Sequence, residues 1–157
     1  MNTLARLAAL LLCTSLNTYA ETSAEDHIAK FIDNFSSETI EGSAANYFIE
    51  TPHFIFGPKV FSPQGATEVE VILSDIRTAL KERDYVKSEV MSFETQFTGE
   101  NMSIISVLLK RYTSKNSILD YICNTYTLAN TKEGWKILSW LPSDPVNSTQ
   151  CFNNNTY

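Results

Sequence analysis

A few acidic, aromatic and amide side chains in the second half of the chain could do chemistry together. Asp120, Asn124 and Tyr126 are separated by even numbers of residues, so an extended strand would point all three to one side. His53 and Glu94 are further titratable candidates that could join them. General acid–base catalysis requires groups within hydrogen-bond reach of each other, and strand parity alone does not supply that. Glu94 and Asp120 could equally lie on a solvated face.

Aromatic side chains could line a pocket or fill a core, and large aromatic residues dominate protein cores in general. Arg111 ends a mostly apolar, strand-like run. Its guanidinium therefore either emerges into water or reaches a pocket mouth, where it could hold an acidic ligand group. If a pocket exists, we expect its lining to include Phe54, Phe56, Arg111, Tyr112, Asn124, Tyr126 and Trp140.

Several other kinds of chemistry lack their sequence signals. The histidines and cysteines do not have metal-ligand spacing, and neither a Gly-rich phosphate loop nor a nucleophile elbow is present, so we expect no metal and no cofactor. The chain carries 12 Lys and Arg against 18 Asp and Glu, a formal charge of −6. Its longest basic stretch is Lys110-Arg111, so nucleic acid is not an expected partner.

Residues 1–20 have the pattern of a signal peptide. Arg6 precedes an apolar run from Leu7 to Cys13, and the small residues that a signal peptidase reads end at Ala20, after which we predict cleavage. The run is shorter than the roughly 20 residues that span a bilayer. Lipid attachment at Cys13 is a weaker alternative, because bulky Leu12 precedes the cysteine. We therefore predict a secreted, periplasmic protein that does not stay in the membrane after signal removal.

Cys123 and Cys151 remain after such a cleavage, an even pair in a compartment where disulfides persist. If 117–129 and 135–141 form a hairpin, Cys123 lies near the level of Leu141, and the chain needs only to turn back for Cys151 to reach it. The alternative is a buried apolar thiol at Cys123 and a free Cys151. We predict the disulfide.

Helical patterns dominate the first half of the mature chain. Thr22 and Ser23, followed by Glu25 and Asp26, form a capping arrangement before an apolar stripe with helical spacing. The further predictions are a second helix from Thr39 to Phe48, a short edge strand from His53 to Phe56 with Lys59–Ser62 as its hairpin partner, and a third helix that starts at a Thr67/Glu70 capping box and ends near Arg83.

From Tyr85 the pattern changes to that of strands, which we predict at 85–97, 102–113, 117–129 and 135–141. A chain in which helices precede a meander of antiparallel strands is typical of the α+β class, in which the helices pack on one face of a bent sheet. We predict one domain at residues 21–144 and a poorly ordered tail at 145–157, which is rich in Ser and Asn.

Residues 25–144 resemble the NTF2-like superfamily, specifically its SnoaL-like and ketosteroid-isomerase-like branch. The segments that carry this resemblance are 47–56 (YFIETPHFIF), 109–112 (LKRY), 126–128 (YTL) and 134–137 (GWKI). The resemblance implies a cone-shaped α+β half-barrel, N-terminal helices packed on a bent and mostly antiparallel sheet, a pocket between sheet and helices, and frequent dimerisation through the convex sheet face.

The resemblance does not settle function, because members of this superfamily include isomerases, dehydratases and catalytically silent binding domains. The isomerase pattern needs a carboxylate base and a Tyr–Asp pair that donates to an oxyanion, and that full set cannot be placed in this sequence. We therefore expect an exported domain that binds a small, partly apolar molecule or a partner, and that forms a homodimer. The alternatives are a SnoaL-like isomerase or dehydratase with a carboxylate base, and a structural dimer whose cone is filled by side chains.

Overall fold

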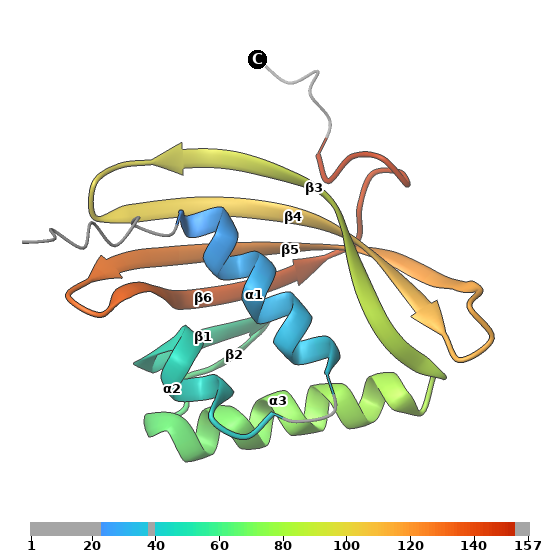
Figure 1. The fold of residues 1–157 in the computed structure, drawn as a ribbon, viewed down its shortest axis with the longest axis horizontal. Helices are drawn as coiled ribbons and strands as arrows, with labels where there is room; N and C mark the ends of the chain where they lie inside the picture. The colour runs from blue at the N-terminus through green and yellow to red at the C-terminus, as the bar shows by residue number, and fades with distance from the viewer. Residues whose placement is uncertain (1–22, 38–39, 153–157) are drawn as a thin grey trace, which may run out of the picture.

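A six-stranded mixed sheet with helices packed on it makes up the fold of residues 23–37 and 40–152, which the computed structural model describes (Figure 1). Residues 1–20 and the last part of the predicted tail, 153–157, lie outside the described residues. In chain order the elements are α1 (Ala24–Ser36), α2 (Ser43–Tyr47), β1 (Phe48–Phe56), β2 (Lys59–Phe61), α3 (Gly65–Lys81), β3 (Tyr85–Thr98), β4 (Met102–Thr113), β5 (Ile118–Thr131) and β6 (Gly134–Ser143).

Helix α1 starts as its sequence predicts. The Ser23 hydroxyl accepts a hydrogen bond from Asp26 N at 3.0 Å, and Asp26 Oδ2 accepts one from Ser23 N at 3.2 Å. This reciprocal pair satisfies two N–H groups that a helix end leaves free. Thr22 lies outside the described residues. The predicted stripe is buried, with Ile28, Phe31, Ile32 and Phe35 facing the sheet.

The predicted second helix is wrong in both length and end. Helix α2 has five residues, and Phe48, expected as its last inward residue, begins β1 instead. Gly42, at the N-cap, has a φ of 77°, a left-handed conformation that interrupts a regular helix. Phe48 pairs with Ile137 of β6, so long-range strand pairing overrides the local helical pattern.

His53–Phe56 lies in a strand, as predicted, but the prediction that this strand is at the sheet edge is wrong. Strand β1 lies between β2 and β6, and it is the short β2 that forms the edge next to it. Pro52 is tolerated inside β1 because the pairing with β6 shifts register between Phe48 and His53, so its missing N–H falls at an irregularity of the ladder. The predicted hairpin partner is correct, since β2 pairs antiparallel with β1.

Helix α3 begins earlier than its predicted capping box. Gln64 is the N-cap, and its N–H donates to Glu68 Oε2 at 2.7 Å. Thr67 lies inside the helix, and Glu70 accepts instead from Gly42 N at 2.9 Å. Glu70 therefore ties α3 to the turn before α2, a long-range contact that short-range spacing does not report.

The predicted meander of four antiparallel strands is confirmed, as β3 to β6. The sheet order is β2-β1-β6-β5-β4-β3, and all neighbours pair antiparallel except β1 and β6, which are parallel. The ladder of β3 on β4 shifts register at three places, and such bulges bend a strand. Strand β3 accordingly curves across the sheet, so that its first residues reach the C-terminal end of α3 (Figure 1).

The opposite face of the sheet carries the C-terminal segment. Cys123 of β5 forms a disulfide with Cys151, with 5.5 Å between their Cα atoms, and the two pack with Leu108. Cys123 pairs with Ser143 on β6, close to the level that the hairpin prediction requires. None of the described helices is long and apolar enough to cross a membrane.

Breaking the disulfide should destabilise the protein. The bond closes a loop with a sequence separation of 28 residues, and in the chain-entropy model this raises the free energy of the unfolded chain by about 3.6 kcal/mol. We expect Cys151→Ser to lower the free energy of unfolding by about this amount, measured by urea denaturation without reductant. Adding reductant should weaken the wild-type protein and leave the variant unchanged. Equal wild-type stability with and without reductant would contradict the prediction.

Candidate functional site

A cavity of about 250 Å³ lies between the helices and the inner face of the sheet. Its walls are mostly apolar, and the charged residues lining it are two arginines. Helices α1 and α3 form one side, and strands β4, β5 and β6 form much of the other. The lining residues used below are Phe35, Leu80, Leu109, Ile122, Tyr126 and Trp140 on the apolar wall, with Arg83, Ser88, Arg111 and Asn124 as polar groups.

The inner wall is aromatic. Tyr126 is buried and stacks on Trp140, with ring centroids 5.9 Å apart and an interplanar angle of 26°. Burial raises the pKa of the Tyr126 phenol far above its ordinary value, although a hydrogen bond from Asn124 opposes this effect. The phenol therefore stays neutral at physiological pH and can donate a hydrogen bond.

Two buried polar atoms beside this wall lack a partner. Asn124 Oδ1 and Trp140 Nε1 make no hydrogen bond to any described residue, and both side chains line the cavity. Leaving a buried polar group unpaired costs about 1–3 kcal/mol. A ligand or water inside the cavity could relieve this cost by accepting from the indole and donating to the amide oxygen.

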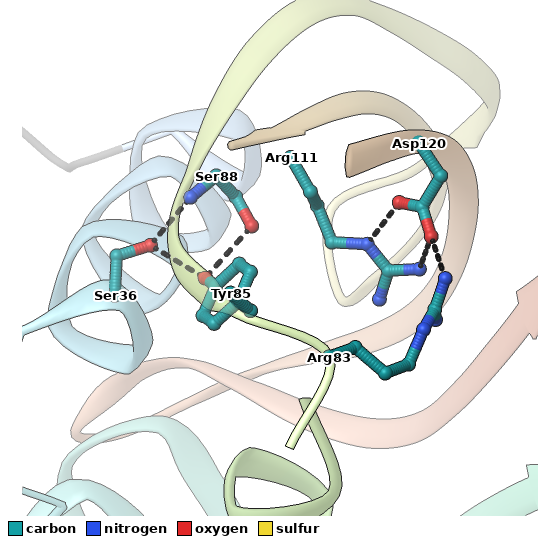
Figure 2. A network of polar contacts seen from close by, with 6 residues as sticks. All are labelled: Ser36, Arg83, Tyr85, Ser88, Arg111 and Asp120. Atoms are coloured by element: carbon teal, nitrogen blue, oxygen red, sulfur yellow. Dashed lines mark hydrogen bonds and ion pairs between the residues drawn. The ribbon is translucent and has the colours of Figure 1, made fainter. Parts of the chain in front are cut away.

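A charged cluster forms the rim. Arg111 Nε donates to Asp120 Oδ1 at 2.5 Å and its Nη2 donates to Oδ2 at 2.7 Å, while Arg83 Nη2 donates to the same Oδ2 at 2.7 Å (Figure 2). Strand pairing makes this geometry possible, because Arg111 of β4 lies directly opposite Asp120 of β5. The Arg111 side chain is 11% exposed and that of Arg83 is 53% exposed. The sequence allowed Arg111 to lie either in water or at a pocket mouth, and the structure places it at the cavity rim.

Hydroxyl groups hold the neighbouring part of the rim. Tyr85 OH lies 3.1 Å from Ser36 Oγ and 2.9 Å from Ser88 Oγ, and Ser88 N donates to Ser36 Oγ at 3.1 Å (Figure 2). The contacts join the end of α1 to the start of β3. They keep Ser88 at the cavity edge beside the arginine cluster.

Asp120 is a weak candidate for a general base. Partial burial would raise the pKa of its carboxyl, but the hydrogen bonds and positive charges of Arg111 and Arg83 outweigh burial and hold that pKa below its ordinary value. A carboxylate with a lowered pKa accepts a proton poorly, and both its oxygens are already hydrogen-bonded. The arrangement suits binding of a charged group better than proton transfer.

The structure brings five of the predicted lining residues together and places the other two elsewhere. Phe54 is fully buried in the core, between Phe48 and Phe56. Tyr112 donates a hydrogen bond to Glu89, away from the cavity. The five predicted residues that do line the cavity are Phe56, Arg111, Asn124, Tyr126 and Trp140.

The titratable candidates for catalysis, which are Asp120, Tyr126, His53 and Glu94, do not form one cluster. Tyr126 lines the cavity, and Asp120 joins it through the arginines at the rim. His53 is exposed, and its Nδ1 lies 2.8 Å from Ser62 Oγ. Glu94 Oε1 accepts a hydrogen bond from Cys151 N at 3.2 Å, beside the disulfide on the opposite face of the sheet.

Sequence reasoning missed several lining residues. Phe35 and Leu80 belong to the apolar stripes of α1 and α3, so a stripe expected to face a core also faces the cavity. Arg83 follows α3, and nothing in its local sequence sets it apart from a solvated arginine. Ser88 lies in β3, whose bends decide which of its residues turn inward.

A family model described as NTF2-like protein (DUF6841) matches residues 20–145. Among curated proteins, none matches this chain. Several solved structures share its fold. A domain of unknown function with a cystatin-like fold from Nostoc punctiforme aligns with a TM-score of 0.62 and 20% identity, over 83% of this chain and 80% of that one.

Two further solved structures come from proteins with a suggested activity. A proposed dehydratase of the NTF2-like family from Streptomyces avermitilis has a TM-score of 0.57 and 12% identity, over 77% of this chain and 93% of that one. A proposed ketosteroid isomerase from Parabacteroides distasonis has a TM-score of 0.57 and 10% identity, over 83% and 94%. At these identities the likeness concerns the fold.

The Asp120 ion pairs should make stability depend on pH. Because the folded pKa of Asp120 is lowered, its contribution is present above the unfolded pKa of about 3.9 and is lost as pH falls through the folded pKa. We expect Asp120→Asn to lower the free energy of unfolding by about 1–2 kcal/mol at pH 7, and by much less near pH 2. Urea denaturation of the wild type and the variant between pH 2 and pH 7 measures the loss at each pH. An equal loss at both ends of the range would refute the assignment.

Proposed function

Since this chain belongs to the NTF2-like family DUF6841, we propose that it is a binding protein that holds a small, largely apolar molecule in the cavity between its helices and its sheet. The observation that carries the proposal is the cavity itself. Apolar walls with a few convergent polar groups are the usual character of a ligand site. A cavity of about 150 Å³ binds benzene, so about 250 Å³ suits a bicyclic or medium-chain molecule.

The unpartnered atoms in the cavity support a ligand rather than a filled cone. Asn124 Oδ1 and Trp140 Nε1 are buried without a protein partner among the described residues, which is costly for a purely structural core. Tyr126 adds a neutral phenol to the same wall. These groups could orient a ligand while the aromatic rings supply contact area.

We include export in this proposal. Residues 1–20 have a signal-peptide pattern, which would leave the binding domain at 21–144 in a secreted, periplasmic location. The disulfide between Cys123 and Cys151 supports this placement, because such bonds persist in oxidising compartments.

An isomerase or dehydratase is the second candidate function, favoured by the suggested activities of the similar folds. Its base would be Asp120, but the two arginines lower the pKa of that carboxyl. Tyr126 could still stabilise an oxyanion. Ligand binding does not require Asp120 to accept a proton, so the lowered pKa of this carboxyl is compatible with the binding proposal.

Homodimerisation belongs to the proposal as well. Exposed apolar side chains, among them Met91, Phe97 and Met102, occur on strands β3 and β4 and could be covered by a second copy. A monomer in sedimentation at tens of micromolar would count against this part.

Filling the cavity should abolish binding. Ile122 lines the cavity from β5, and we expect Ile122→Phe to remove saturable binding of octanamide and octanoate, read from the change in tryptophan fluorescence on titration. Ile104→Phe is the matched control. Ile104 alternates with buried Ile105 on β4 and so points to the opposite face, and this variant should bind as the wild type does.

The binding proposal fails if neither probe saturates the wild-type protein, or if Ile122→Phe and the wild type bind equally. Native mass spectrometry of the protein as purified provides an independent check. A co-purifying mass should be present in the wild type and absent from Ile122→Phe.

A further inference from the structure

We infer that the cavity ligand is an amphipathic monocarboxylic acid, with its carboxylate held by Arg111 and Arg83 and its apolar part against the apolar wall. This inference rests on the proposed function, because it names the chemical class of the molecule that the cavity would hold. Charge, geometry and distance each support it.

The charge at the rim is incompletely neutralised. Two guanidinium groups share one carboxylate, so the cluster of Arg83, Arg111 and Asp120 keeps one positive charge. Among the described residues that line the cavity, no Asp or Glu is present to balance it. The protein as a whole is acidic, with a formal charge of −6, so the charge of the rim is opposite in sign to that of the whole protein. A monoanion would neutralise it.

The donor geometry suits a carboxylate. Arg111 uses Nε and Nη2 on Asp120, and within the described part of the chain its Nη1 makes no hydrogen bond to a protein acceptor (Figure 2). Arg83 uses Nη2 alone and is half exposed, so it can turn toward a ligand at little cost. Guanidinium groups bind carboxylates through paired N–H donors, which makes two neighbouring arginines a specific receptor for this group.

The apolar wall begins directly below the charged rim. Leu109 and Ile122 pair with each other, and each lies two residues along its strand from Arg111 or Asp120, on the same face. Asn124 is four residues from Asp120, which corresponds to about 13 Å along a strand. Ile122 is two residues from Asp120, or about 7 Å along the strand. A chain of about eight carbon atoms with its carboxylate at the rim would therefore lay its tail over Leu109 and Ile122, directed toward Asn124.

Calorimetric titration of the mature, disulfide-bonded protein with octanoate and octanamide tests this assignment. The two probes have the same number of non-hydrogen atoms and differ in the charge of one end. We expect the wild type to bind octanoate at least about tenfold more tightly than octanamide, because a hydrogen bond to a charged group is worth about that factor. Acetate should bind at least about tenfold more weakly than octanoate, because it lacks the apolar tail.

Variants at the rim distinguish specific recognition of the carboxylate from a general effect of positive charge. Arg111→Gln and Arg83→Gln should weaken octanoate binding and leave octanamide binding unchanged. Lys110→Gln is the matched control, since it removes one positive charge from the neighbouring position of β4, whose side chain lies beside Glu89 and Tyr112 instead. Asp120→Asn should strengthen octanoate binding several-fold, because it removes the competing anion. Mere structural damage would weaken binding instead.

The outcomes distinguish this inference from the proposed function. Equal affinity for octanamide and octanoate would overturn the carboxylate assignment and leave cavity binding intact. Binding of neither probe would overturn both. If acetate binds as tightly as octanoate, or if Lys110→Gln weakens octanoate binding as much as Arg111→Gln, the rim is a general anion site and the inference is wrong.

Discussion

The packing of Phe31 against the aromatic wall of the sheet is the contact on which the rest of the structure depends. Its ring meets those of Trp140 and Tyr126 edge-on, at centroid distances of 5.7 and 6.1 Å, and meets Phe48 edge-on at 5.1 Å. Edge-to-face contacts of this kind add to the energy of simple burial. They hold the middle of α1 against the sheet, and Phe31 lines the cavity together with Phe35 one turn later.

The cavity and its rim follow from the pairing of β4 with β5. The same register that sets Leu109 opposite Ile122 in the apolar wall sets Arg111 opposite Asp120 at the rim. The cross-strand pair reduces the cost of holding Arg111 close to an apolar space. Arg83 then adds the charge that makes the rim positive. The register of β4 on β5 therefore sets both the apolar wall of the cavity and its charged rim.

Local patterns predicted most of the fold, and failed where distant pairing decided the outcome. The stripe of α1 and the strands of the meander match their predictions because each element has the period and capping that its final environment requires. Within 48–56 the predicted strand at His53–Phe56 is correct, but Phe48 and the edge position are not, because both depend on parallel pairing with β6, more than eighty residues later in the chain. A helical reading of Phe48 was locally reasonable and globally wrong.

For the site, the sequence by itself determined that Asn124 and Tyr126 share one face of a strand, since that follows from alternation alone. It also predicted the disulfide between Cys123 and Cys151, as an even pair at a compatible strand level, and the structure contains that bond. Only the tertiary structure decided that Arg83 and Arg111 meet at Asp120, and that Glu94 and His53 lie elsewhere. Arg111 and Asp120 lie nine residues apart across the hairpin of β4 and β5, but Arg83 follows α3, 37 residues before Asp120. Its contact depends on how α3 packs on the sheet, and no spacing along the sequence records that distance.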